Sequence, residues 1–347
     1  MSPTAPSPQP YLVKVHTYLS SASSRKTSPM QTYEHLPNFP AAASENALVF
    51  IGGLGDGPHT IPYVRTLAER LFSSSSPSPS PSSSSSSAAA VAGPYYAVFE
   101  ARLTSAFTAF GYGSLAQDAR EIGDLVRYLR RDLGMRKVVL MGHSTGCQDC
   151  LEYGTKFVFE SSSASDDDDD AEVVRVDGFV LQGPVSDREA IAMGEDAAEV
   201  AAALRVAEEM VKEGKAGEVM PQNAMPKGWK GSLVTAYRWL SLAGVGGDDD
   251  YFSSDLSDEK LTSIWGKLEQ PVLILPSEKD EWVPPQIDVV GLVNRWKRFC
   301  KPGVASECSG LIPGANHRVE NADGQHWLAE RVARFLITID SQRIEEL

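Results

Sequence analysis

The sequence predicts an α/β fold with a mostly parallel central sheet flanked by helices. Short apolar runs, rich in β-branched or aromatic residues and bounded by Gly, Pro or charge, read as buried strands. They alternate with longer helical patterns, and that alternation is typical of a parallel sheet covered on both faces. The expected strands are 47–51, 95–99, 137–141, 178–181 and 272–275.

Helical patterns occupy most of the chain between these strands. They cover residues 61–72, 115–133 and 145–159, and a fourth pattern at 285–299 follows the last strand. In the second pattern, Leu115, Ile122 and Leu129 recur at helical spacing, while charged residues such as Asp118 and Glu121 take the other face. The pattern predicts an amphipathic helix.

The alternation breaks between residues 186 and 266. This stretch opens with an Ala/Glu-rich helical pattern, continues through Pro and Gly punctuation, and contains no clear buried strand. We interpret 186–266 as an inserted, mainly helical lid, with 1–185 and 267–347 forming one catalytic core.

Two low-complexity segments are predicted to be disordered loops. A Ser/Pro tract covers 73–90, and 161–170 contains five consecutive aspartates. Neither can bury enough apolar surface to offset the entropy of ordering. The aspartate run also lacks the spaced ligands of a calcium loop, so we interpret it as solvated charge.

Composition excludes several classes of protein. The 347 residues include 32 Lys+Arg and 46 Asp+Glu, and the formal charge of −14 disfavours nucleic acid as a partner. No apolar run approaches the roughly 18 residues of a membrane span, and the first residues lack a secretory pattern, so a cytoplasmic protein without membrane attachment is expected. Cys147 and Cys150 form a C-x-x-C that we expect to be packed thiols rather than a redox or zinc site.

Residues 137–149, KVVLMGHSTGCQD, carry the strongest chemical signal. A buried strand leads into Gly142-His143-Ser144-Thr145-Gly146 and then into a helical pattern. This is G-x-S-x-G in the strand–turn–helix context of a nucleophile elbow, where a sharp turn exposes the serine at the carboxyl end of the sheet. The motif predicts Ser144 as a nucleophile and the α/β-hydrolase fold.

A serine nucleophile needs a base and an acid behind it, and this fold supplies them in the order Ser, Asp or Glu, His. Asp280 follows the last expected strand in SEKDEWVPP, and His317 lies in LIPGANHRVE ahead of the C-terminal helix. Both fit the order. Glu278 and Glu281 flank Asp280 as alternative acids, although each is more simply a solvated loop charge.

Three other histidines compete with His317. His326 lies in a helical stretch, His143 adjoins the nucleophile and is expected to pack against neighbouring structure, and His59 sits in the loop after the first long strand. His59 could edge the site without serving as the base.

That loop, GGLGDGPH at 52–59, fails both nucleotide-binding patterns, because Pro58 and His59 stand where glycine or Lys-Ser/Thr would be needed. Its position suits the oxyanion loop of a hydrolase instead. We nominate the backbone N–H groups of Leu54 and Thr145 as the oxyanion hole.

Several distant motifs together resemble one family. GGLGDG, LMGHSTGCQD, DDDYFSSDL, PSEKDEWVP and PGANH are similar to the fungal α/β hydrolases of formerly unknown function that include the siderophore esterases acting on fusarinine C or its triacetyl form. The resemblance covers nearly the whole chain and implies an intracellular esterase, with Ser144, Asp280 and His317 as its triad. A glycine pair stands where many hydrolases have His-Gly.

The expected chemistry is a two-step acyl transfer to Ser144 from a small-molecule ester, with no cofactor and no metal. Trp239, Tyr251 and Phe252 of the lid either shape the acyl pocket or only pack the lid. An esterase or lactonase for another metabolite, and a non-catalytic ligand-binding protein on the same scaffold, remain as alternatives.

Overall fold

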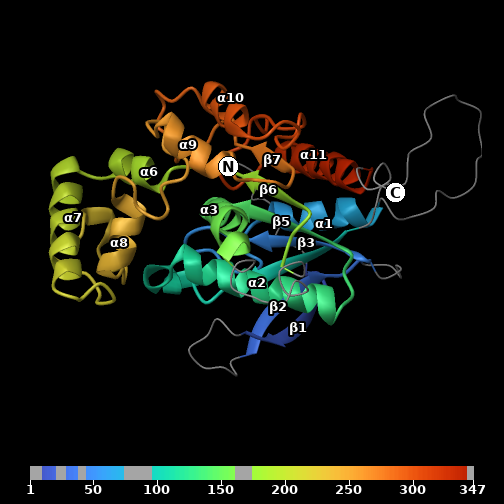
Figure 1. Ribbon diagram of the computed structural model, residues 1–347, viewed down its shortest axis with the longest axis horizontal. Helices are drawn as coiled ribbons and strands as arrows, with labels where there is room; N and C mark the ends of the chain where they lie inside the picture. The colour runs from blue at the N-terminus through green and yellow to red at the C-terminus, as the bar shows by residue number, and fades with distance from the viewer. Residues whose placement is uncertain (1–9, 21–28, 38–43, 74–95, 161–173, 342–347) are drawn as a thin grey trace, which may run out of the picture.

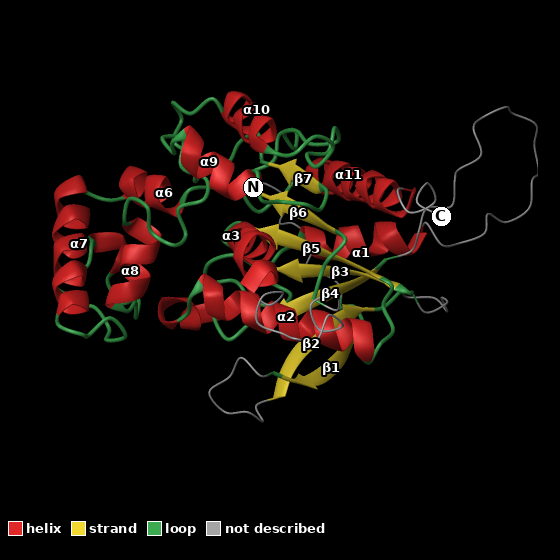
Figure 2. Cartoon of the chain, viewed as in Figure 1, coloured by secondary structure: helices red, strands yellow, loops and turns green. Residues whose placement is uncertain are grey.

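The computed structural model describes residues 10–20, 29–37, 44–73, 96–160 and 174–341. Within these ranges a seven-stranded sheet runs through the molecule with helices on both faces (Figures 1 and 2). The strands are β1 (Val13–Leu19), β2 (Pro29–His35), β3 (Asn46–Ile51), β4 (Ala97–Arg102), β5 (Lys137–His143), β6 (Gly178–Gln182) and β7 (Val272–Leu275).

The strand order β1-β2-β4-β3-β5-β6-β7 is that of a mostly parallel sheet. Strands β3 to β7 are parallel and correspond to the five predicted strands, so the predicted α/β class is confirmed. The antiparallel hairpin β1–β2, which pairs with β4, was not predicted. β1 is the edge strand and β2 lies between β1 and β4. Both strands lack a continuous apolar sequence because they are partly exposed.

Helices cover the sheet and extend beyond it. They are α1 (Tyr63–Ser73), α2 (Leu115–Arg131), α3 (Gly146–Glu152), α6 (Asp187–Gly194), α7 (Ala197–Lys212), α8 (Ala236–Ala243), α9 (Asp258–Trp265), α10 (Val289–Phe299) and α11 (Ala322–Ser341), with short helical segments η1 (Phe107–Tyr112), η2 (Tyr153–Phe157) and η3 (Lys227–Trp229). The predicted helix 145–159 is thus α3 followed by the π-helical turn η2.

The central strands are mostly apolar because each contributes side chains to two cores. Along β3, Val49 packs towards α2 and α3, whereas Leu48 and Phe50 pack towards α1 and α11. Successive side chains of a strand point to opposite faces, so a strand covered on both sides has no polar face. This architecture fixes the carboxyl ends of the parallel strands at one edge of the sheet.

Helix α2 begins where the sequence predicted, because the Ser114 hydroxyl accepts a hydrogen bond from the N–H of Gln117 (3.2 Å). Asp118 and Glu121, on the face opposite the apolar residues, are both buried. Periodicity places such residues on one side of a helix, but it cannot reveal that another layer of the protein covers that side.

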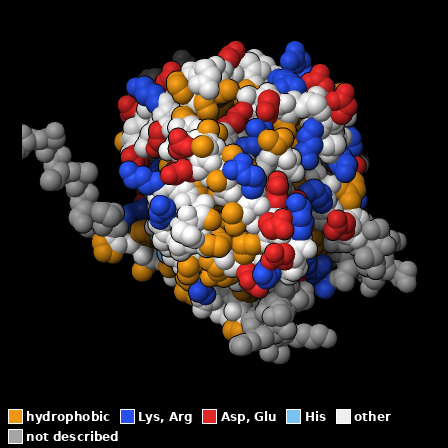
Figure 3. Space-filling model, turned by 90° about the vertical axis from the view of Figure 1, so that its left-hand side faces the viewer, with side chains coloured by type: hydrophobic (Ala, Val, Ile, Leu, Met, Phe, Trp, Pro, Cys, Tyr) orange, Lys and Arg blue, Asp and Glu red, His pale blue; other side chains and the backbone are white. Residues whose placement is uncertain are grey.

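The stretch expected to be a lid, 186–266, contains α6 to α9 and lies between β6 and β7. Helices α7 and α8 stand away from the sheet (Figure 1) and share a separate apolar cluster that includes Ala203, Ala207 and Trp239. Figure 3 views the molecule from this side, where charged side chains of both signs are interspersed with apolar groups. Apart from Ser73, the predicted loops 73–90 and 161–170 lie outside the described residues.

In the ranges that the structure describes, no helix combines the length and the apolar character needed to cross a membrane.

Candidate active site

Ser144 occupies the turn between β5 and α3 with a φ of 54°, a left-handed conformation that is rare for a residue other than glycine. The flanking glycines are required by close backbone approach. An ideal Cβ on Gly142 would lie 2.2 Å from the carbonyl oxygen of Gly146, and one on Gly146 would lie 2.4 Å from that of Ile51. The turn therefore has the tight geometry of a nucleophile elbow, and Ser144 is partly exposed.

Asp280 and His317 come together as a hydrogen-bonded pair. Asp280 follows β7, His317 precedes α11, and His317 Nδ1 lies 2.8 Å from Asp280 Oδ2. The side chain of His317 is 5% exposed and that of Asp280 is 2% exposed. A carboxylate can only accept, so Nδ1 carries the proton and Nε2 is left as a proton acceptor.

The two alternative acids bind backbone instead of the imidazole. Glu281 Oε2 accepts from the N–H of His317 (2.8 Å), and Glu278 Oε2 accepts from the N–H of Gly314 (2.5 Å). They fix the loop that carries His317. His326 is exposed on α11 and takes no part in this pair.

Gln182, at the end of β6, links the elbow to the histidine loop and was missed by sequence reasoning. Its carbonyl oxygen accepts from the N–H of Ser144 (3.0 Å), and its Nε2 donates to the carbonyl oxygen of His317 (3.3 Å). Its Oε1 accepts from Tyr63 Oη (3.0 Å) and His143 Nδ1 (2.5 Å). The only signal was a single polar residue ending the apolar strand GFVLQ.

His143 is a packed histidine, as expected. It is buried, and its ring centroid lies 4.9 Å from that of His317. Burial, and then the proximity of His317, lower the pKa of His143 to about 3. His143 is therefore neutral at physiological pH and adds no positive charge beside the elbow.

The glycine-rich loop lies directly against the nucleophile. An ideal Cβ on Gly53 would fall 2.6 Å from Ser144 Cβ, and the N–H of Gly53 donates to Asp56 Oδ2 (3.3 Å). Within the described residues, the N–H groups of Leu54 and Thr145 have no acceptor in the protein. Two amides without partners beside the serine are what an oxyanion hole requires.

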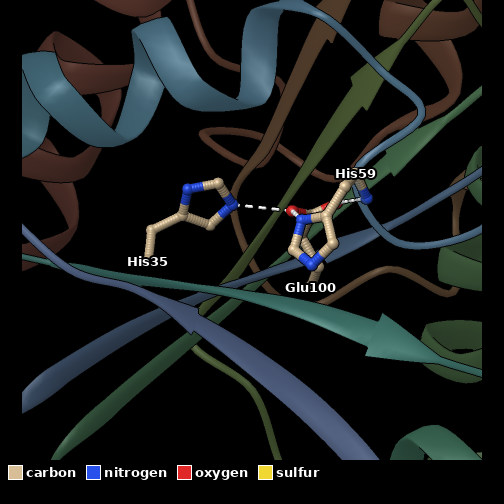
Figure 4. Close-up of side chains that lie close together, drawn as sticks. All are labelled: His35, His59 and Glu100. Carbon is tan, nitrogen blue, oxygen red and sulfur yellow. Dashed lines mark hydrogen bonds and ion pairs between the residues drawn. The ribbon is translucent and has the colours of Figure 1, made fainter. Parts of the chain in front are cut away.

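His35, His59 and Glu100 cluster behind this loop (Figure 4). Glu100 Oε1 lies 2.6 Å from His35 Nε2 and 2.7 Å from His59 Nδ1, and Glu100 Oε2 accepts from the N–H of His59 (2.7 Å). Burial opposes ionisation of Glu100, but hydrogen bonds from the two histidines outweigh it and lower the pKa of the carboxyl to about 2. These are ligand types that could hold a metal ion. Their direct mutual bonds already hold the loop to β2 and β4.

The three lid aromatics are packing residues in this structure. Trp239 is fully buried, with its ring centroid 5.1 Å from that of Trp229. The ring centroid of Phe252 lies 5.3 Å from that of Trp296. The Tyr251 hydroxyl donates to the carboxylate of Glu152, at the end of α3. A substrate contact for any of them stays a prediction.

Cys147 and Cys150 are buried free thiols on α3. Burial raises the pKa of both thiols well above its ordinary value, which disfavours the reactive thiolate.

A small cavity of about 30 Å³ opens beside the glycine-rich loop. Its wall includes Leu54 and Thr145, together with Asp118, Asp149 and Arg238, which sequence reasoning did not connect with the site. The last three come from α2, α3 and α8, so no local pattern could have grouped them.

Known proteins resemble this chain over most of its length. The fusarinine C esterase sidJ of Aspergillus fumigatus is 29% identical over 89% of this chain and 93% of that protein, and esterase AN6793 of Emericella nidulans is 27% identical over 85% and 87%. The structure of the siderophore hydrolase EstB from Aspergillus fumigatus is 26% identical and covers 94% of this chain and 98% of its own, with a TM-score of 0.69.

These similarities confirm the predicted α/β-hydrolase fold and the prediction of an esterase-type hydrolase. The family model described as "Protein of unknown function (DUF1749)" matches residues 1–86 and 82–337, and the chain therefore belongs to that family.

Proposed function

We propose that this protein is a serine esterase in which Ser144 is the nucleophile, His317 the general base and Asp280 the residue that orients the base. The observations that carry the proposal are the Asp280–His317 hydrogen bond of 2.8 Å and the turn after β5 that holds Ser144 at a φ of 54°. A carboxylate on Nδ1 leaves Nε2 free to take the serine proton, and a strained elbow exposes the hydroxyl.

The reaction proceeds in two steps. Ser144 attacks the ester carbonyl while His317 takes its proton, and the N–H groups of Leu54 and Thr145 stabilise the oxyanion. His317 then protonates the departing alcohol, which leaves an acyl-enzyme. Water, activated by the same imidazole, attacks the acyl group and releases the acid.

The proposed substrate is a fusarinine-type siderophore, whose ester bonds would be opened in the cytoplasm. Support comes from the similarity to a fusarinine C esterase and to a siderophore hydrolase, which align with this chain almost end to end. Any iron would enter with the substrate. A metal is not needed for the acyl transfer described above.

Fluorophosphonate labelling tests the catalytic assignment. We expect one adduct on Ser144, located by peptide mass spectrometry, and none in Ser144→Ala. Folded wild-type protein without an adduct would contradict the proposal.

Incubation with fusarinine C, with and without iron, tests the substrate. Mass spectrometry should show ring-opened products with wild type and intact macrocycle with Ser144→Ala. If wild type reacts with fluorophosphonate but leaves the macrocycle intact, the substrate is an unrelated ester.

A further inference from the structure

The cavity beside the glycine-rich loop has a wall whose chemistry the two-step mechanism does not use. Both core and lid build it, since it is lined by Gly53, Leu54 and Thr145, by Asp118 and Asp149, and by Arg238 of α8, among others. Its volume of about 30 Å³ suits one group the size of a water molecule or an ammonium.

The unpartnered polar side-chain atoms on this wall are all oxygens. Asp118 Oδ1, Asp149 Oδ1 and Thr145 Oγ1 are buried and, among the described residues, none has a partner in normal hydrogen-bond geometry. The three residues are each at most 5% exposed. Buried acceptors without donors are costly. Two carboxyl oxygens and one hydroxyl oxygen around one small volume can accept hydrogen bonds from a group that carries several N–H donors once the carboxyls are ionised.

Most of the charged side chains around the cavity are acidic, which also favours a cationic group. Three buried aspartates, Asp118, Asp149 and Asp249, and the partly buried Asp187 surround the buried Arg238. The arginine is engaged elsewhere, because its Nη1 donates to Asp249 Oδ2 (2.5 Å) and its Nε to the carbonyl oxygen of Phe110 (3.1 Å). Among the described residues, Asp118 and Asp149 make no direct ion pair with Arg238, although its positive charge acts on both.

These carboxyls are poised to ionise when a cation arrives. Burial raises the pKa of Asp118 to about 7, and burial followed by the nearby Asp118 and Asp249 raises that of Asp149 well above its ordinary value. The charged groups that face the pair are Glu121 on α2, Glu152 on α3, Arg238 on α8 and Asp249. An ammonium would favour the ionised carboxyls by direct charge pairing.

The position of the cavity beside the proposed oxyanion amides indicates that the acyl part of an ester substrate would reach it. Leu54 and Thr145 supply both the proposed oxyanion donors and part of the cavity wall. Ser144 and His317 are not among the residues that line the cavity. An acyl subsite here therefore requires that the atoms next to a carbonyl held by these amides extend past the glycine-rich loop into the cavity.

We propose that this cavity is an acyl subsite for an ammonium group, so that the enzyme prefers esters whose acyl part carries a protonated amine close to the carbonyl. The inference rests on the proposed function, because it takes Ser144 and the oxyanion amides as the reacting site.

A matched pair of esters tests the preference: alanine ethyl ester, whose amine is charged, and N-acetylalanine ethyl ester, whose amine is acylated. We expect wild type to favour the first in kcat/KM. Asp149→Asn should lower the ratio of the two kcat/KM values by about tenfold or more, as for loss of a charge-assisted hydrogen bond. Asp118→Asn provides the same test if the first variant does not fold.

Asp124→Asn is the matched control. Asp124 is buried on the same helix as Asp118 and binds Ser20 and Arg127, outside the cavity wall. Its substitution should leave the ratio unchanged. A ratio near one in wild type, or one unaffected in Asp118→Asn and Asp149→Asn, would overturn the subsite.

Methylammonium gives a readout that does not depend on turnover of these esters. It should inhibit hydrolysis of p-nitrophenyl acetate, more strongly at about pH 8 than at about pH 6, whereas the bulkier tetramethylammonium should not. Absence of inhibition overturns the subsite but leaves the esterase proposal standing. Failure of wild type to hydrolyse p-nitrophenyl acetate or to react with fluorophosphonate counts against the esterase proposal itself.

Discussion

At the residue scale, the absence of a side chain at Gly53 is what lets the loop approach the nucleophile. An added Cβ would lie 2.6 Å from Ser144 Cβ and 3.2 Å from Ser144 Oγ, so one of the two must move. Gly53→Ala should therefore lower kcat/KM for p-nitrophenyl butyrate by about a hundredfold, because small displacements at a reacting centre have effects of that size.

Gly55→Ala separates this clash from general damage to the loop. Gly55 has a φ of +78°, and an added Cβ meets nothing within 4 Å. This variant should lose about 1 kcal/mol of unfolding free energy in urea titration, from backbone strain, yet keep its turnover. Equal losses of activity in both variants would contradict the proposed contact.

Asp280 and Glu281 contact the same histidine in different ways, and substitution can distinguish their roles. Asp280→Asn removes the carboxylate that holds the proton on Nδ1 and should lower kcat by about 10³- to 10⁴-fold with little change in thermal stability. Glu281→Gln keeps an oxygen that accepts from the N–H of His317, so its kcat should fall less than about tenfold. Comparable losses of kcat in the two variants would contradict the proposed role of Asp280 in orienting the base.

At the scale of elements, the parts of the fold that the sequence predicted are those with local signatures. Each of the strands β3 to β7 contains a short apolar run, and the elbow is a five-residue motif between a strand and a helix. The hairpin β1–β2 was not predicted because its strands mix polar and apolar residues. The burial of Asp118 could not be predicted, because Arg238 of α8, which lines the same cavity, is brought there only by tertiary packing.

The hairpin β1–β2 also helps to position the glycine-rich loop. His35, at the end of β2, binds Glu100, and Glu100 accepts a hydrogen bond from the N–H of His59 in that loop. Glu100→Gln should destabilise the protein by about 3 kcal/mol near neutral pH, given a carboxyl whose pKa falls from 4.5 to about 2 on folding. It should also speed amide hydrogen exchange at residues 53–59.

The sign of the pH effect follows from the lowered pKa. The stabilisation by Glu100 is present above about pH 4.5 and is lost as the pH falls towards 2, so wild type and Glu100→Gln should converge in acid. Glu34→Gln is the control, because Glu34 lies on the same hairpin but binds His16. Faster exchange at 53–59 in that variant would show that the hairpin as a whole, rather than Glu100, orders the loop.

At the scale of the whole molecule, the acidic cluster between core and lid sets how stability depends on pH. Burial raises the pKa of Asp118 and of Asp187 to about 7 and raises that of Asp149 as well. The folded protein therefore keeps protons that the unfolded chain releases above about pH 4, and stability must fall as the pH rises through this range. The lowered pKa of His143 has the opposite effect on the pH dependence of stability, but it involves only one proton.

We accordingly expect the unfolding free energy from urea titration to be larger at about pH 5 than at about pH 7.5. The double variant Asp118→Asn/Asp187→Asn removes two of the groups responsible and should flatten the slope between these pH values. A stability that rises over this interval in wild type, or a slope unchanged in the double variant, would mean that the buried aspartates are ionised in the free protein. In that case a cation already bound at the cluster would be needed to balance the charge of four aspartates against Arg238.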